Sequence, residues 1–439
     1  MRYSFRAGAA AIITAAALLA TGCSTPANSP EAGGSGGGKS VELTYWAWAP
    51  NLEKVIDIWN QKNPDIHVTV NKQDGGDPAV TKLLTAIKAG SGAPDLIQAE
   101  YQKIPTLVSA DALADLSGTA AGSTKDSFPA GVWDSVTLGG DALYAVPQDT
   151  GPVVFYYRAD IFEGLGLSVP TTWDEYAAAA KTIHDADPTQ FLGTFSSNDA
   201  GWFTAMSQQA GASWWGIDGD AWSVNIDKEP TQKVANYWGG LVESGVIDNQ
   251  PMYTPAWNTG LNTGKQVGWL SAAWGPGVLS GNAESTAGKW KVAPMPQWDA
   301  AKPATGNWGG SSTAVTTQSK NVDAAAEFAT WLNTDPEAIK ALVAETGIYP
   351  ADTAGAKSAL TEPPAFFSNQ PDFYNVIAEA AATVSNFTYG PNVNVAYSAY
   401  NDEFAKAAQS KKQSDFAKAV SNMQSITTDD LKNSGFTVK

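Results

Sequence analysis

The alternation of short strands and amphipathic helices after residue 40 constrains the fold more strongly than any other feature of the sequence. We predict strands at 41–48, 66–70 and 93–100 and helices at 50–64 and 78–90. In the first predicted helix, Leu52, Val55, Ile56 and Trp59 recur at the spacing of one helical face. Strands and helices that alternate over short connections are typical of right-handed βαβ units in a parallel sheet. The expected fold class is therefore α/β.

The ends of these strands indicate where a ligand would bind. In open α/β sheets, ligands lie beyond the carboxyl ends of the strands. The rule selects Trp48 after the first strand, the segment around Gln73 and Asp74 after the second, and Glu100 with Tyr101 after the third. These side chains are the first candidates for a binding site.

The start of the chain is typical of an export signal. A short cationic segment precedes an apolar, alanine-rich run that is too short for a convincing membrane span, and LLATGC ends at Cys23, the single cysteine. This end resembles a bacterial lipobox, with Ala20 where Leu is more usual. We expect residues 1–22 to be a signal peptide, Cys23 to be lipidated and residues 23–40 to include a flexible linker. The alternative is a signal peptide cut elsewhere beside an incidental cysteine.

One motif in the expected linker is misleading. Residues 33–40, GGSGGGKS, satisfy the nucleotide-binding pattern G-x-x-x-x-G-K-[ST]. That loop binds phosphate only when a strand leads into it and a helix leaves it, because the backbone N–H groups and the helix dipole must converge. Here a linker precedes the motif and a strand follows, so the sequence does not favour a nucleotide site.

Charge and aromatic content narrow the ligand class. The chain has 44 acidic and 27 basic residues and a net charge of −17, which disfavours nucleic acids and anionic substrates. It also has 17 tryptophans, and indoles together with planar carboxylate and amide groups match the C–H faces and hydroxyls of a sugar. The two histidines, His67 and His184, lie in separate predicted elements, which argues against a metal cluster or catalytic triad. No metal and no cofactor is expected.

Ordered segments of the chain resemble the extracellular solute-binding proteins of ABC transporters, in the carbohydrate-binding branch that includes maltose-binding protein. The similar segments are LTYWAW, GSGAPDLIQAE, ALYAVPQDTGPVVFYYRADIFEGLGLSVPTTWDEYAAAAKTI, GKQVGWLSAAWGPGVL, VAPMPQ, GGSSTAVTTQSKNVDAAAEFATWLNTDPEA and TGIYPA. The resemblance implies a two-lobed periplasmic-binding-protein-like fold, with a hinge and an interlobe ligand cleft. It places the N-terminal lobe at 41–148 plus 304–335 and the C-terminal lobe at 149–303 plus 336–439.

The resemblance also implies which residues meet a sugar. Trp48, Glu100 and Tyr101 recur as candidates, and Asp149 falls at the crossing between lobes. Trp202 and Trp274 correspond to aromatic platforms of the second lobe, and Trp308 with Gly309 to the return into the first. The expected ligand-binding set is Trp48, Asp74, Glu100, Tyr101, Asp149, Trp202, Trp274, Trp308 and Gly309.

The other tryptophans are expected to be structural. In the uncharged stretch 201–216, GWFTAMSQQAGASWWG, we assign Trp202 to the sugar and Trp214 with Trp215 to packing. Trp59 and Trp331 are expected in the core, and Trp173 at the start of a helix with a capping box from Thr172 to Glu175. GIDGDAW at 216–222 is similar to the start of a calcium loop, but Trp222 and Ser223 stand where a ligand and an obligatory glycine belong, so the segment predicts a turn.

The expected function is capture of a neutral di- or oligosaccharide by a monomeric, lipid-anchored protein outside the cell membrane, for delivery to the permease of an ABC importer. Isothermal titration against a panel of mono- and disaccharides would test the size of the sugar. A secreted glycoside hydrolase is the first alternative, because Glu100 and Asp149 could form the required carboxylate pair, about 5 to 9.5 Å apart. A polyamine-binding protein of the same fold is the second.

Overall fold

The computed structural model describes residues 40–439, apart from Asp220. The expectations about the signal peptide, Cys23 and the linker lie outside the described residues, as does the nucleotide-binding-like motif up to Lys39. No helix among residues 40–219 and 221–439 combines the length and hydropathy that a membrane crossing needs.

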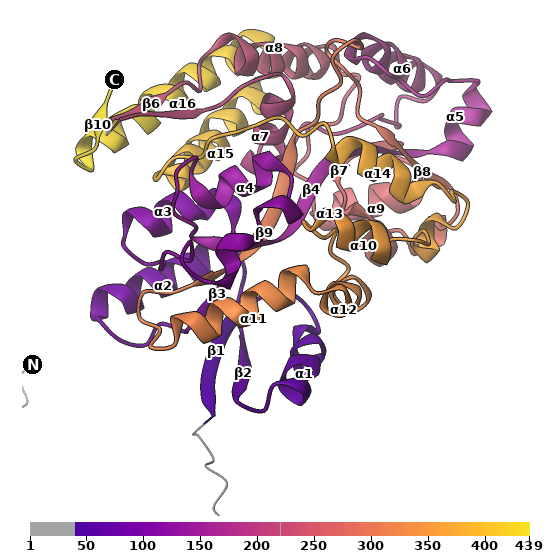
Figure 1. The fold of residues 1–439 in the computed structure, drawn as a ribbon. Helices are drawn as coiled ribbons and strands as arrows, with labels where there is room; N and C mark the ends of the chain where they lie inside the picture. The colour runs from indigo at the N-terminus through magenta and orange to yellow at the C-terminus, as the bar shows by residue number, and fades with distance from the viewer. Residues whose placement is uncertain (1–39, 220) are drawn as a thin grey trace, which may run out of the picture. The chain divides into compact units, whose positions relative to one another are not determined.

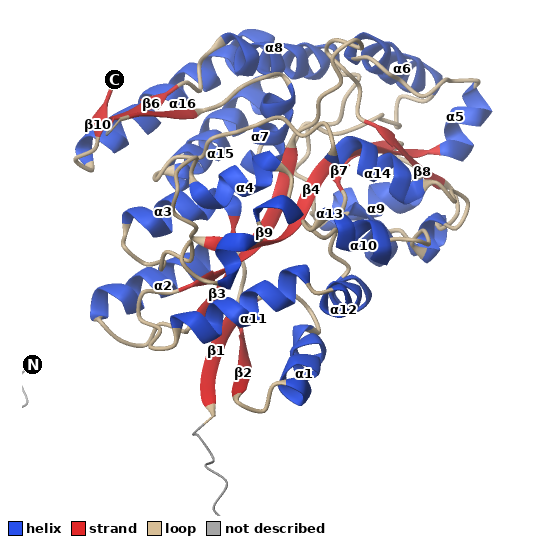
Figure 2. Cartoon of the chain, in the orientation of Figure 1, coloured by secondary structure: helices blue, strands red, loops and turns tan. Residues whose placement is uncertain are grey.

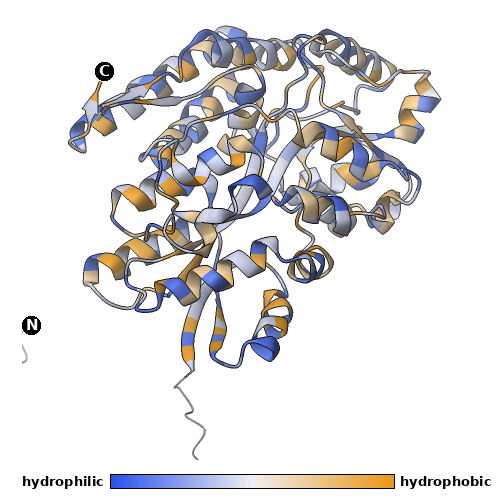
Figure 3. Ribbon diagram, viewed as in Figure 1, coloured by the Kyte–Doolittle hydropathy of each residue, from blue (hydrophilic) through white to orange (hydrophobic). Residues whose placement is uncertain are grey.

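The predicted βαβ units are confirmed. The first elements are β1 (Val41–Ala47), α1 (Leu52–Lys62), β2 (Ile66–Lys72), α2 (Asp77–Ala89) and β3 (Leu96–Glu100). Strand β1 pairs in parallel with both β2 and β3, so it lies between them. Helix α1 buries the four apolar residues expected from its spacing, and Figure 1 shows it beside β2. The alternation of hydrophobic and hydrophilic segments on this helix is visible in Figure 3.

The sheet continues through two long strands that join two hydrophobic cores. Strand β4 (Ala145–Arg158) pairs antiparallel with β9 (Asn307–Val315), and further along with β7 (Gly268–Ala272) and β8 (Trp290–Pro294). The strand order is β2-β1-β3-β9-β4-β7, with β8 also on β4. Figure 2 shows β4 and β9 side by side at the centre of the described part.

The two cores divide along these strands. The first core packs around β1–β3 and takes Ala145 and Val146 from β4; the second begins at Val153 of the same strand. The ladder between β4 and β9 shifts register twice in between, from Pro147 to Asp149 and from Thr150 to Pro152. A third segment crosses there, since Thr150 N donates to the Tyr349 carbonyl at 2.9 Å. The shifts bend the strands where the chain passes from one core to the other.

Helices and short strands complete the two cores. The helices are α3 (Ile104–Ser109), α4 (Ala130–Thr137), α5 (Ala159–Leu165), α6 (Trp173–Ala186), α7 (Ala200–Gln209), α8 (Glu229–Ser244), α9 (Pro255–Thr263), α10 (Gly275–Asn282), α11 (Val322–Thr334), α12 (Pro336–Thr346), α13 (Thr353–Ala359), α14 (Phe373–Ala381), α15 (Val393–Ser410) and α16 (Gln413–Asn433). Short 3₁₀ turns lie at Tyr101–Lys103, Ala120–Ser123, Lys125–Ser127, Glu284–Thr286 and Ala365–Phe367. A separate small sheet contains β5 (Trp215–Asp218), β6 (Ala221–Val224) and β10 (Thr437–Val438).

Several local predictions are confirmed. The capping box joins Thr172 and Glu175 at the start of α6, and Trp173 is buried. Trp59 is buried, and Trp331 packs on it with ring centroids 5.2 Å apart. Residues 216–222, where a turn is expected, instead lie mostly in β5 and β6, which pair antiparallel. Helix α15 begins at Val393, eight residues before Asn401, where the sequence predicts a helix over 401–409, because its first turns mix polar and aromatic residues and blur the apolar period.

The crossing depends on close backbone contact at Gly151. A Cβ atom there would lie 2.2 Å from the Trp308 carbonyl oxygen. Gly151→Ala should therefore lower the free energy of unfolding by about 1 to 3 kcal/mol, because backbone atoms must move to make room. Urea unfolding followed by circular dichroism measures the change. Gly164→Ala is the matched control, since nothing lies within 4 Å of that position in α5 and it should be neutral or stabilising. Equal stability of the two variants would contradict the close-contact argument.

Candidate functional site

A cavity of about 340 Å³ lies beside β9, where the strand passes from one core to the other, and residues of both cores line it. The first core contributes the loop before α2 and the end of β3, and the second contributes the starts of α7 and α15. Strand β9 forms the wall between them. The lining residues are Gly76, Asp77, Glu100, Gln102, Lys103, Asn198, Asp199, Ala200, Gly201, Asn307, Trp308, Gly309, Tyr389, Asn394, Tyr397, Ser398 and Asn401. This volume lies at the lower end of the range for ligand sites.

Glu100 supplies a carboxylate at the end of β3, as the strand-end rule predicted. It is partly buried, and its Oε2 atom lies 3.7 Å from where a Cβ of Gly76 would stand. Burial raises the pKa of Glu100, the Lys103 ammonium lowers it, and the Asp77 carboxylate raises it further. A carboxylate held in this way accepts hydrogen bonds from hydroxyl groups of a neutral ligand.

Lys103 links the two cores across the cavity. Its side chain is buried, its Nζ atom lies 2.5 Å from Asp77 Oδ1, and it also donates to the side-chain oxygen of Asn394 in α15. Nζ stands 5.8 Å from the ring centre of Tyr397. Nearby, Thr106 Oγ1 in α3 donates to the carbonyl of Pro391 at 2.8 Å. The cavity is therefore closed on this side by direct contacts between the cores.

Asp199 faces the cavity from the start of α7. Its side chain accepts a hydrogen bond from the Trp202 backbone N–H at 2.9 Å, which makes it the N-cap of the helix. Burial raises the pKa of Asp199 from its ordinary 3.8 to about 7, although the Trp202 N–H, the Trp308 side chain and the Gly201 N–H each lower it. The sequence analysis did not select this residue. The signal was present in Asn198-Asp199 directly before the helix, a typical cap.

A group of aromatic rings, here called the aromatic wall, extends from Trp308, its one member among the residues that line the cavity. We use this name for Tyr253, Trp257, Trp269, Trp274 and Trp308. Trp274 and Trp308 lie 4.8 Å apart between ring centres, and the other neighbouring pairs lie 5.4 to 6.4 Å apart. Trp274 Nε1 donates to the Trp308 carbonyl at 3.0 Å. Tyr253 is not among the residues predicted from the sequence, yet the residue is 40% exposed and its φ is +65°, a rare value for a residue with a side chain.

Three of the predicted site residues line the cavity. They are Glu100, Trp308 and Gly309. Gly309 has a φ of +79°, a backbone conformation that favours glycine, and a Cβ there would be in ordinary contact with Trp274 Nε1 at 3.5 Å. Trp274 is partly buried in the aromatic wall. Their contact with a sugar stays a prediction.

Four other predicted residues lie behind or beside the cavity. The Tyr101 hydroxyl donates to the Asp149 carbonyl at 2.8 Å. The Asp149 carboxylate accepts from the Ser311 N–H at 2.8 Å and from its hydroxyl, and burial raises the pKa of Asp149 to about 6. Trp48 is partly buried over Gly75, and Asp74 is exposed in its loop. None of the four is among the lining residues.

The placement of Trp202 differs from the expectation of a sugar platform. Its ring is 1% exposed and packs in the second core, with centroids 5.0 Å from Trp238 and 5.8 Å from Phe195. The reason is the phase of α7: its N-terminal residues 199–201 face the cavity, and the next side chain points into the core. Trp214 and Trp215 are buried, as predicted for packing residues.

A larger cavity of about 570 Å³ lies among α4, α13 and α14, and it contains none of the predicted residues. Small apolar side chains such as Ala378 and Ala382 dominate its walls. Sugar recognition needs several polar groups and flat rings, so the smaller cavity fits that chemistry better. Among residues 40–219 and 221–439 no group of three or more His, Cys, Asp or Glu side chains could hold a metal.

The fold and the cavity define a class of protein. Residues 40–339 match the family described as bacterial extracellular solute-binding protein, and the chain belongs to this family. The resemblance found in the sequence is confirmed, and the α/β fold is that of the two-lobed sugar-binding proteins. The first core, around β1–β3, is the core of one lobe, and the second core is the core of the other.

Individual relatives support this assignment. The galacto-N-biose-/lacto-N-biose I-binding protein of an ABC transporter from Bifidobacterium longum, solved with lacto-N-biose, is 31% identical, with a TM-score of 0.81 over 92% of this chain and all of that one. A binding protein from B. animalis subsp. lactis, solved with β-1,6-galactobiose, is 28% identical, with a TM-score of 0.76 over 91% of this chain and all of that one. The arabinooligosaccharide-binding protein of Bacillus subtilis is 23% identical over 76% of this chain and 77% of its own.

The raised pKa of Asp199 makes the stability of the protein depend on pH. Because the folded state holds this proton more tightly than the unfolded state, Asp199 contributes stability at pH 4 that is lost as the pH rises to about 7. Asp199→Asn keeps a capping side chain but has no proton to lose. The difference in unfolding free energy between wild type and variant should therefore change between pH 4 and 7, by at most about 1.4 kcal/mol per pH unit. Urea titrations at several pH values measure it, and a constant difference would contradict the prediction.

Proposed function

We propose that this protein captures a neutral di- or oligosaccharide in the cavity between its lobes and delivers it to the permease of an ABC importer. One observation carries the proposal: Trp308, which belongs to the aromatic wall, lines the cavity together with planar polar side chains from both lobes. Indole faces stack on the C–H face of a pyranose, and carboxylate and amide groups bond to its equatorial hydroxyls. The proposal agrees with the sugars held by the two solved relatives.

The charges of the cavity support a neutral ligand. Asp77, Glu100 and Asp199 line it, and Lys103 is the one basic lining residue. Lys103 is already paired with Asp77, which leaves two carboxyl groups facing the ligand. An anionic ligand would be repelled, whereas each hydrogen bond from a sugar hydroxyl to a carboxylate stabilises the complex by roughly 1.5 to 3 kcal/mol.

The position of the cavity supports capture by closure. A sugar that touches both Glu100 and Asp199 contacts both lobes at once, so it favours the closed arrangement over any open one. We propose further that the protein acts as a monomer, outside the cell membrane, anchored by a lipid on Cys23. The lipobox-like sequence supports the anchor, although Cys23 lies outside the described residues.

We also propose that the site binds without catalysis. Glu100 and Asp149 are the two carboxylates that a hydrolase would use. Glu100 lines the cavity, whereas Asp149 does not line it and accepts hydrogen bonds from Ser311. The relatives that share the fold carry names of binding proteins. A hydrolase reading would instead need both carboxyl groups to flank one glycosidic bond.

Titration calorimetry against mono-, di- and trisaccharides tests the proposal. We expect micromolar or tighter binding of at least one di- or trisaccharide and weaker binding of its constituent monosaccharides, because a second ring adds contacts without a second loss of translational freedom. The bound sugar should be recovered intact by chromatography. Binding of monosaccharides alone would contradict the expected ligand size, and release of reducing ends would contradict a binding role.

The aromatic wall gives a second test. Trp274→Ala should weaken binding of the preferred sugar by roughly 1 to 3 kcal/mol, as is usual for truncation of a large aromatic contact. Calorimetry measures the affinity, and circular dichroism confirms that the variant is folded. Trp222→Ala is the control, because Trp222 is a partly buried tryptophan in β6 and, unlike Trp274, makes no ring contact with Trp308. If both variants bind like the wild type, Trp274 belongs to packing only.

A further inference from the structure

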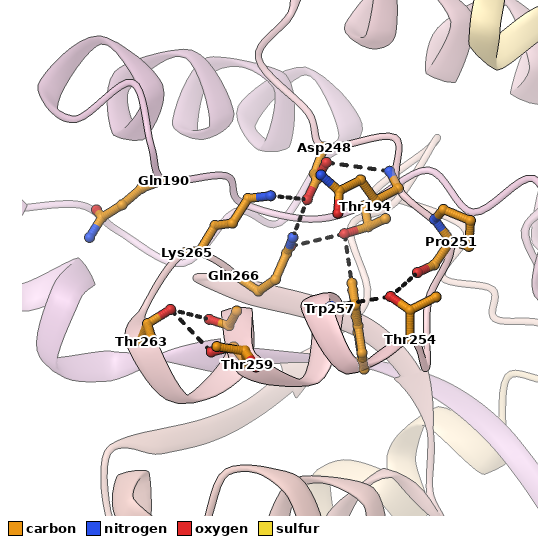
Figure 4. A network of polar contacts seen from close by, with 12 residues as sticks. Gln190, Thr194, Asp248, Pro251, Thr254, Trp257, Thr259, Thr263, Lys265 and Gln266 are labelled. Atoms are coloured by element: carbon orange, nitrogen blue, oxygen red, sulfur yellow. Dashed lines mark hydrogen bonds and ion pairs between the residues drawn. The ribbon is translucent and has the colours of Figure 1, made fainter.

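A buried chain of hydrogen bonds runs away from the aromatic wall (Figure 4). Trp257 Nε1 donates to Thr194 Oγ1 at 3.2 Å, Thr194 Oγ1 donates to Gln266 Oε1 at 2.9 Å, and Gln266 Nε2 donates to Asp248 Oδ2 at 2.7 Å. Trp257, Thr194, Gln266 and Asp248 are all buried, and none lines the cavity. The chain thus begins at a ring of the wall and ends at a carboxylate inside the second lobe.

The direction of each bond is fixed by chemistry. An indole N–H can only donate and an ionised carboxylate can only accept, so the Thr194 hydroxyl must pass its own hydrogen to the Gln266 oxygen. This in turn orients the Gln266 amide, whose N–H group points to Asp248. A charge at one end of such a chain strengthens the bonds along it. Trp257 therefore has one favourable orientation of its N–H group.

The far end of the chain is held by backbone contacts. Phe195 N donates to the Asp248 carbonyl at 2.8 Å, and Asp248 N donates to the Gly193 carbonyl at 3.1 Å. Gln266 N donates to the Gly260 carbonyl at 3.0 Å. The partly exposed Lys265 Nζ stands 3.0 Å from Asp248 Oδ2 and balances its charge. Three separate segments of the second lobe therefore anchor the chain.

Trp257 connects the hydrogen-bond chain to the aromatic wall through its ring contacts. Its ring centre lies 5.5 Å from Tyr253 and 5.4 Å from Trp269, which in turn contacts Trp274 and Trp308. Tyr253 is exposed and holds a positive φ, a conformation that persists only when surrounding contacts enforce it. A shift of Trp257 would remove one of those contacts and the support behind Trp269.

We propose that Thr194, Gln266 and Asp248 are positioning residues that set the orientation of the aromatic wall, and that they thereby control affinity for the stacked sugar. This inference rests on the proposed function, because it presumes that the wall meets a sugar ring. Sites held within a fraction of an ångström by buried hydrogen bonds lose affinity when that support is removed, even though no ligand contact is deleted.

The protein has a second buried tryptophan–threonine hydrogen bond that can serve as a control for this role. Trp290 Nε1 donates to Thr286 Oγ1 at 2.9 Å, and Thr286 Oγ1 donates to the Ala283 carbonyl at 2.6 Å. Both side chains are buried, as in the first pair. Among the described residues, however, Trp290 makes none of the ring contacts that join the aromatic wall. Removal of the Thr286 hydroxyl therefore leaves a buried indole N–H without its partner, as at Thr194, but does not affect a ring that contacts the aromatic wall.

The experiment compares Thr194→Val with Thr286→Val. Each variant leaves a buried indole N–H without a partner, so both should lower the melting temperature. Only Thr194→Val should weaken binding of the preferred disaccharide, by roughly 10-fold, which corresponds to the net contribution of about one hydrogen bond. Thr286→Val should keep wild-type affinity. Thr194→Ser restores the hydroxyl and should recover most of the affinity. The near-ultraviolet circular dichroism of the unliganded Thr194→Val variant should also change.

The outcomes separate the two proposals. If the wild type binds no sugar in the panel, the proposed function fails. If the wild type binds and folded Thr194→Val binds equally well, the hydrogen-bond chain is structural and the inference is overturned. Where Thr194→Val does not fold, Asp248→Asn replaces it, because the amide keeps the shape and removes the charge. Weaker binding by folded Asp248→Asn supports the inference, and unchanged binding overturns it.

Discussion

The antiparallel pairing of β4 with β9 is the constraint on which the rest of the structure depends. Both strands begin in one core and end in the other, so a single ladder joins the lobes and also forms one wall of the cavity. The register shifts at Asp149 and Thr150 bend this ladder, and Gly151 allows the Trp308 backbone to approach. Trp308 reaches the cavity because its strand is held there by the pairing. The site is therefore a consequence of how the chain crosses between its cores.

Burial of acidic side chains gives the cavity its character. Glu100 and Asp199 are both removed from water, which raises their pKa, and each sits near groups that favour its charged form: Lys103 for Glu100 and backbone N–H groups for Asp199. An incoming hydroxyl-rich ligand can donate to both carboxyl groups and so replace the water they have lost. The same arrangement would bind a less polar molecule poorly, because the carboxyl groups would be left without partners.

The fold could be predicted from local patterns, whereas the site could be predicted only in part. The strands and helices before Glu100 follow from apolar period and length, and Glu100 follows from its place at a strand end. Trp202 was assigned wrongly because a tryptophan that stacks on a ligand and one that packs in a core have the same chemistry, and only the phase of α7 separates them. Tyr253 could not be found, because its positive φ is set by tertiary contacts.

The contacts of Lys103 with Asn394 and of Thr106 with Pro391 affect how easily the two lobes can separate. Both join the lobes through protein atoms alone, so any movement that separates the lobes on this side of the cavity has to break them. The free energy of these two contacts therefore opposes separation of the lobes by protein atoms alone.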